Sequence, residues 1–146
     1  MNNPGDLPDV NLLFAIVNQD HAAHMAASQW FDCVEQFALT PVTLNGLLRL
    51  LLNPVAMPNT PAPRQALRAV DSLRAAKGAV FWPDDLVPGS KMRFAYAISG
   101  HRQVTDLHLL NLAAAHGGRL VTFNQKITAV LNPRDRKYVC ELTSDV

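Results

Sequence analysis

The segment Gly117-Gly118-Arg119-Leu120-Val121-Thr122-Phe123-Asn124 decides the fold class of this chain. Its centre, Leu120–Phe123, is a continuous, largely apolar run without alternation, which is typical of a parallel strand buried on both faces. The two glycines before it end a helix that we expect to begin at Thr105 or Asp106 and to run to His116. A helix followed by a buried strand is the unit from which α/β domains with right-handed crossovers are built.

The same alternation of strands and helices extends toward both termini. Short apolar runs predict strands at Leu7–Asn11, Phe37–Val42 and Ala79–Trp82, and an edge strand at Tyr138–Leu142. Apolar spacing and capping residues predict helices over Leu12–Asn18, His21–Phe37 (capped by Asp20), Leu44–Leu52, Arg64–Lys77 and Lys91–Ser99. We therefore predict an α/β fold with a mostly parallel sheet.

Length and composition limit what such a fold can be. The 146 residues suit one domain over 1–146, and 49% hydrophobic residues are enough for a sizeable core. The net charge of +1 excludes a strongly basic coat for non-specific binding of nucleic acid. Residues 1–48 nevertheless carry five acidic and no basic side chains, whereas residues 49–146 carry all 13 basic ones. The N-terminus lacks the features of a signal peptide, so we expect a cytoplasmic protein in which Cys33 and Cys140 are reduced, buried thiols.

Polar side chains follow the predicted strands where each strand ends. Since the carboxyl ends of parallel strands meet at one edge of a sheet, we expect these side chains to lie close together. Their oxygen atoms suit a hard cation such as Mg²⁺ or Mn²⁺, although the same residue types also serve as ordinary cap and turn residues. The candidates after strands are Asp9 and Asn11, then Thr40, Thr43 and Asn45, and finally Thr122 and Asn124; the loop before the last long helix adds Thr105 and Asp106.

Four short segments together resemble one known family, in its order and at similar intervals. The resemblance is to the PIN-domain ribonucleases, and among them to the VapC-type toxins of bacterial toxin–antitoxin pairs. It implies a three-layer α/β/α fold with a central, mostly parallel sheet, and an acidic cluster that binds divalent metal and hydrolyses RNA phosphodiester bonds. The matching segments are Leu7–Leu13, Thr40–Arg49, Val104–Leu110 and Gly117–Asn124.

The family's acidic positions can be carried over where the motifs match. Asp9 corresponds to the first acid and Asp106 to the acid at the start of the late helix, so the resemblance implies that both ligate Mg²⁺ (or Mn²⁺). Asn11 and Thr105 correspond to polar neighbours that orient these ligands, and Thr43 is a further candidate supporting residue.

Two positions of this sequence depart from the family's usual pattern. Asn45 stands where most members have Glu, although a subgroup carries Asn-Gly as in Asn45-Gly46, and Asn124 stands where most have Asp. An amide oxygen can ligate a cation but brings no charge, so we expect these two residues to supplement the site. Arg49, one turn after Asn45, is a candidate for contacting a substrate phosphate or for pairing with one of the acids.

The leading hypothesis is a metal-dependent endoribonuclease, in which a metal-activated water attacks the RNA phosphate. The resemblance further implies a homodimer and a small antitoxin protein as partner. The longest apolar runs are too short to span a bilayer, so we expect no membrane association. Two alternatives remain. The loss of acids at two positions favours a PIN-fold binding module for RNA or an antitoxin-like partner, without turnover. An unrelated phosphohydrolase would need a glycine-rich phosphate loop or a nucleophile elbow, and we find neither.

Overall fold

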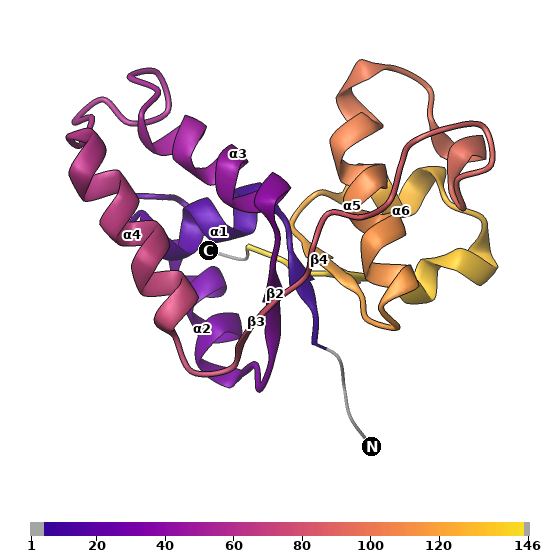
Figure 1. Cartoon of the computed structure of the whole chain (residues 1–146), viewed down its shortest axis with the longest axis horizontal. Coiled ribbons are helices and arrows are strands. Elements are labelled where there is room, and N and C mark those ends of the chain that lie inside the picture. Colours follow the sequence, from indigo (N-terminus) through magenta and orange to yellow (C-terminus); the bar gives the residue numbers. More distant parts are fainter. Residues whose placement is uncertain (1–4, 145–146) are drawn as a thin grey trace.

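The computed structural model describes residues 5–144, in which short strands form a parallel array (Figure 1). The strands are β1 (Leu7–Pro8), β2 (Phe37–Leu39), β3 (Ala79–Phe81), β4 (Leu120–Thr122) and β5 (Val139–Glu141). β1 pairs with β4, β4 with β5, and β2 with β3, while a parallel bridge between Asp6 and Phe37 sets β2 beside β1. The order across the array is β3-β2-β1-β4-β5, and the predicted parallel sheet with β5 at its edge is confirmed.

Helices cover both faces of this array, with α1 to α4 on one side and α5 and α6 on the other (Figure 1). The helices are α1 (Val10–Val17), α2 (His24–Cys33), α3 (Pro41–Leu51), α4 (Pro63–Ala75), α5 (Val104–Ala115) and α6 (Gln125–Val130), with short 3₁₀ turns at Ala95–Ala97, His101–Gln103 and Pro133–Tyr138. The predicted three-layer α/β/α fold is therefore confirmed. Within residues 5–144, every helix is too short or too polar to span a lipid bilayer.

The strand order reverses its direction between β1 and β4. From β1 the chain continues through α1 and α2 to β2, whereas β4 is reached through α5 on the opposite face. In open parallel sheets such a reversal leaves a crevice outside the carboxyl ends of the two strands, because their connections leave in opposite directions. Asp9 follows β1 and Asn124 follows β4, so both lie at this crevice.

Burial explains why the central elements form as predicted. All three residues of β4 are fully buried, which confirms that this strand is covered on both faces. The helix before it, α5, is buried on most of its circumference, because it packs between the sheet and the turn at Pro133–Tyr138. The fully buried side chains of α5 include Leu107, Leu109, Leu110 and Leu112.

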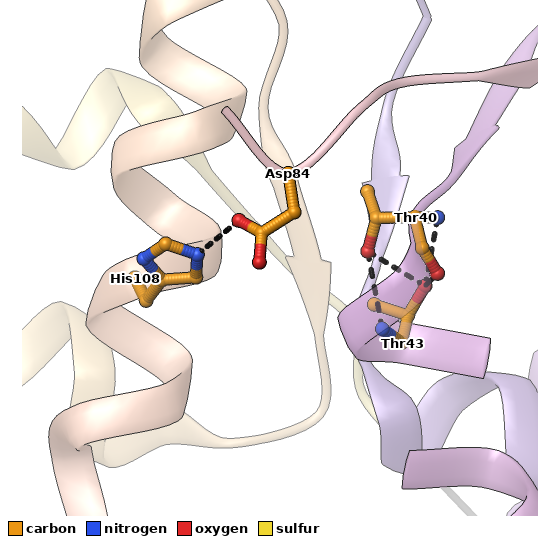
Figure 2. A network of polar contacts seen from close by, with 4 residues as sticks. All are labelled: Thr40, Thr43, Asp84 and His108. Carbon is orange, nitrogen blue, oxygen red and sulfur yellow. Dashed lines mark hydrogen bonds and ion pairs between the residues drawn. The ribbon is translucent and has the colours of Figure 1, made fainter. Parts of the chain in front are cut away.

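The start of α3 lies further upstream than predicted. The Thr40 hydroxyl accepts from the backbone N–H of Thr43 at 3.1 Å, and the Thr43 hydroxyl accepts from the backbone N–H of Thr40 at 3.1 Å. This reciprocal cap, with Pro41 at the first helical position, begins the helix and limits β2 to three residues (Figure 2). Further along α3, a Cβ atom at Gly46 would lie 2.6 Å from Cγ2 of Val10, so glycine allows α3 to pack closely against α1.

The helix predicted over His21–Phe37 is shorter than expected at both ends. The helix predicted from His21 begins only at His24, because Asp20 does not cap it and the backbone N–H of Ala23 donates instead to Nδ1 of His21. The helix also ends at Cys33, which is exposed rather than buried, while Cys140 is half-buried and both thiols are free.

The helix predicted over Lys91–Ser99 is reduced to a single 3₁₀ turn. Tertiary hydrogen bonds hold this segment in place of helical ones: Arg93 donates to the Tyr138 hydroxyl at 2.8 Å, and the Tyr96 hydroxyl donates to Asp135 at 2.6 Å. These contacts tie the segment to the turn that precedes β5. The pattern of apolar residues alone does not reveal them, because the partners lie about 40 positions away.

Candidate active site

Asp9 is held at the carboxyl end of β1 by hydrogen bonds from two elements. Its side chain caps α1, where Oδ1 accepts from the backbone N–H of Leu12 at 2.8 Å. Oδ2 accepts from the Thr122 hydroxyl of β4, and the backbone N–H of Asp9 donates to the carbonyl oxygen of Val121 at 3.0 Å. Only 2% of Asp9 is exposed, so its carboxylate is fixed in position at the crevice between β1 and β4.

The second acid, Asp106, lies on the first turn of α5 and is half-buried. The side-chain amide nitrogen of Asn124 donates to its Oδ2 at 3.5 Å. Asn124 is itself fixed, since its backbone N–H donates to the Thr122 hydroxyl oxygen and its Oδ1 accepts from the backbone N–H of Lys126. A continuous series of contacts thus joins Asp9, Thr122, Asn124 and Asp106. We call Asp9 and Asp106 the acid pair.

Both members of the acid pair have raised pKa values. Burial raises the pKa of Asp9 from 3.8 to about 6; the hydrogen bonds from Thr122 and Leu12 lower it in part, and the charge of Asp106 raises it further. Burial also raises the pKa of Asp106, and the hydrogen bond from Asn124 opposes this. In residues 5–144, the salt-bridge contacts join Asp6 to Arg119 and Asp84 to His108, and neither Arg119 nor His108 contacts the acid pair in this way. The site therefore holds negative charge that no basic side chain compensates.

The donor set fits a divalent cation bound by few protein ligands. Mg²⁺ is commonly held by one or two carboxylates, with waters and substrate phosphates completing its shell. The acid pair supplies two carboxylates, while the described part of the chain has no cluster of three or more His, Cys, Asp or Glu side chains suited to a metal. Asn124 presents its nitrogen to Asp106 and uses its oxygen to cap α6, so the acid pair is the core of the site.

The raised pKa of Asp9 predicts that the metal-free protein becomes less stable as the pH rises from about 4 to about 6. The folded state holds this proton more tightly than the unfolded chain, so the group favours folding at the acidic end and disfavours it above its folded pKa. A shift from 3.8 to about 6 corresponds to about 3 kcal/mol. Urea unfolding of wild type and Asp9→Asn in chelator, across this range, measures the difference. Parallel pH profiles for the two proteins would contradict the assignment.

The other predicted site residues have no hydrogen bonds to the acid pair among the described residues. Asn11 is exposed on the first turn of α1, and Thr105 is exposed beside Asp106. Asn45 and Arg49 are exposed one turn apart on α3, and Arg49 has no ion pair within residues 5–144. Thr43 is buried in the cap of α3, where its partner is Thr40.

Two features of the site were not singled out from the sequence. Thr122 holds Asp9, although the sequence ranks it only as one of several polar residues after a strand. Asp84 follows β3 and accepts from Nε2 of His108 on α5, with 2.6 Å between the two atoms (Figure 2). Asp84 is also a polar residue that comes shortly after a strand, Ala79–Phe81, so the same sequence criterion could have identified it.

Comparison with known proteins places this chain among ribonucleases, although no family model matches it. Ribonuclease VapC39 of Mycobacterium tuberculosis is 41% identical over 122 residues, which cover 81% of this chain and 87% of that protein. Ribonuclease VapC38 of the same organism is 35% identical over 94% of this chain and 97% of its own length. Ribonuclease VapC44, also from this organism, is 34% identical over 87% of this chain and 91% of its own. The resemblance read from four short segments therefore extends along nearly the whole sequence, and the chain belongs to the VapC family of ribonucleases.

Proposed function

We propose that this protein is a divalent-metal-dependent endoribonuclease, the toxin of a toxin–antitoxin pair. The observation that carries the proposal is the acid pair, two carboxylates with raised pKa values at the point where the strand order reverses. Neighbouring carboxylates without a basic partner suit a bound cation, because the cation relieves the repulsion between them. The relatives named as ribonucleases support RNA as the substrate.

Asp9 and Asp106 would hold Mg²⁺ or Mn²⁺. A divalent ion bound there would neutralise charge at the scissile phosphate and lower the pKa of an attacking water. Thr122 and the backbone N–H of Leu12 orient the Asp9 carboxylate, so that its free lone pairs point in a fixed direction. Asn124 fixes Asp106 through its amide nitrogen, which restrains that carboxylate without adding charge.

The exposed polar residues at the starts of α1 and α5 and on α3 suit contacts to the RNA. Arg49 carries an unpaired positive charge in the described part of the chain, and it suits an RNA phosphate better than a buried acid, because its side chain is exposed. Asn45, one turn earlier on the same helix, suits a second polar contact to the backbone. Asn11 and Thr105, next to the two ligands in sequence, suit water or phosphate oxygens at the rim.

Removal of divalent metal is expected to abolish RNA cleavage. The acid pair carries no cation of its own, so without metal the carboxylates would repel the phosphate rather than bind it. The measurement is cleavage of a fluorescently labelled single-stranded RNA with Mg²⁺, with Mn²⁺ and with excess EDTA. Metal added back after EDTA should restore the rate. Undiminished cleavage in EDTA would contradict the proposal.

A second candidate function is an RNA- or antitoxin-binding module without turnover. The observation in its favour is that Asn124 turns its amide nitrogen toward Asp106, which leaves two carboxylates where the family commonly has three or four. This candidate predicts RNA binding that metal does not strengthen. Efficient metal-dependent cleavage by the natural chain would exclude it.

The proposal also includes the partners and the setting of the protein. Membership of the VapC family implies an antitoxin partner, and we further propose a homodimer of single-domain chains in the cytoplasm. Exposed apolar side chains on and near α3 and α4 support the homodimer, since a second copy would cover them. These side chains are Leu52, Val55 and Leu67, with 39%, 88% and 52% of their surface exposed.

A further inference from the structure

A cavity of about 320 Å³ lies next to the acid pair and is not part of it. Its walls come from three places: the first turn of α3, the segment after β3 and the first turns of α5. Thr105, the neighbour of Asp106, lines the cavity, so the cavity opens at the same edge of the sheet as the acid pair. Its apolar wall includes Val42, Leu86, Met92 and Val104.

Three polar residues interrupt this apolar wall among the described lining residues: Thr105 at its edge, and Asp84 and His108, which contact each other. Oδ1 of Asp84 lies 2.6 Å from Nε2 of His108, so the imidazole fixes the orientation of the carboxylate (Figure 2). The Asp84 side chain keeps 30% of its surface exposed, against 14% for His108. Oδ2 of Asp84 accepts no hydrogen bond from the described residues, and Oδ1 keeps a second lone pair beside its contact with His108, so the carboxylate can still accept two hydrogen bonds from a ligand in the cavity.

We propose that this cavity binds an unpaired guanine base of the RNA substrate, with Asp84 as the residue that reads it. The inference deepens the proposed ribonuclease function and rests on it for the presence of RNA at this edge of the sheet. A carboxylate only accepts hydrogen bonds, and guanine is the base whose Watson–Crick edge offers two neighbouring donors, N1–H and the N2 amino group. Adenine and cytosine offer one donor beside an acceptor, and uracil offers one donor between two acceptors.

The surroundings of Asp84 favour a base over a phosphate. A negatively charged side chain repels phosphate, whereas apolar walls suit the flat faces of a base. Sequence-specific proteins read single-stranded RNA by enclosing splayed bases and bonding to their Watson–Crick edges. His108 is a positioning residue here, since its contact with Oδ1 holds the carboxylate while Oδ2 and the remaining lone pair of Oδ1 can accept from the base. A base in this cavity would belong to a nucleotide close to the scissile phosphate at the acid pair.

Binding of short RNAs tests the proposal separately from cleavage. The probes are fluorescently labelled oligouridines that carry one central guanosine, inosine or adenosine, and the measurement is fluorescence anisotropy in EDTA. Inosine lacks only the N2 amino group, so it removes one of the two donors. The variants are Asp84→Asn, which replaces one acceptor oxygen by a donor, and Asp85→Asn, which makes the same change at the exposed neighbouring residue. Thermal unfolding of each variant checks that it folds.

Wild type and Asp85→Asn should bind the guanosine RNA about ten-fold more tightly than the inosine or adenosine RNA, a discrimination typical of a paired contact to a base edge. Asp84→Asn should lose most of this preference while retaining the wild-type affinity for the inosine and adenosine RNAs. Equal binding of guanosine and inosine RNA by wild type, or an unchanged preference in Asp84→Asn, would overturn the inference. Cleavage without guanine preference would support the proposed ribonuclease function and contradict the guanine site. Guanine preference without cleavage would support the guanine site and contradict the ribonuclease function.

Discussion

Replacing Asp9 by Asn is expected to slow RNA cleavage at least about 100-fold, since it removes one of two charged ligands from the proposed metal site. The same change should stabilise the metal-free protein at neutral pH. Burial raises the pKa of Asp9 to about 6, so near pH 7 the folded protein holds a buried charge that the amide does not carry. The gain is at most about 3 kcal/mol. The amide oxygen can still accept from the Leu12 N–H, so the cap of α1 is retained.

The opposite directions of these two effects make the prediction specific. Single-turnover cleavage with Mn²⁺ gives the rate, and urea unfolding in EDTA gives the stability of the same preparations. Asp20→Asn is the matched control, because Asp20 is exposed on the loop before α2 and its side chain touches neither acid. It should leave both quantities unchanged. Wild-type activity in Asp9→Asn would refute the proposed role of Asp9, and loss of both activity and stability would indicate a merely structural one.

Replacing Asn124 by Asp is expected to tighten Mg²⁺ binding about ten-fold or more, because it adds a third carboxylate beside Asp106. In the metal-free protein the new charge should be destabilising near neutral pH, since it lies at 3.5 Å from Oδ2 of Asp106 in place of a hydrogen-bond donor. The new carboxylate can still accept from the Lys126 N–H, so the start of α6 is preserved. Calorimetric titration with Mg²⁺ and thermal unfolding with and without Mg²⁺ measure the two effects.

Asn53→Asp is the matched control for this change. Asn53 is exposed, and its Oδ1 accepts from the backbone N–H of Val55 at 2.9 Å, so it has the same local contact as Asn124 without a carboxylate beside it. The control should not alter Mg²⁺ affinity. If Asn124→Asp binds Mg²⁺ no better than wild type, Asn124 does not face the metal. If only Asn124→Asp cleaves RNA, the natural chain is the binding module rather than the enzyme.

The elements that sequence predicts best are those whose signals are local. The apolar run at β4 is buried on both faces, and α4 begins at Pro63, one residue before the start predicted at Arg64. The predicted end of this helix at Lys77 is two residues too late: α4 ends at Ala75 with Ala76 as its cap, and Gly78, with a φ of 87°, lies beyond it. Lys91–Ser99 fails because its structure depends on distant partners such as Tyr138 and Asp135, which no local pattern reveals.

The candidate site, too, is predicted by the sequence only in part. The sequence alone places Asp9, Asp106 and Asn124 next to strands and helix starts, and its motifs suffice to name the family. Only the tertiary structure shows that Thr122 holds Asp9, that Asn124 turns its nitrogen to Asp106, and that Thr43 serves a cap. Side-chain orientation and burial depend on what packs around each residue, and pKa values follow from burial and neighbouring charge. For the same reason, the contact of Asp84 with His108 depends on packing between elements, since the two residues lie 24 positions apart. Both line the same cavity.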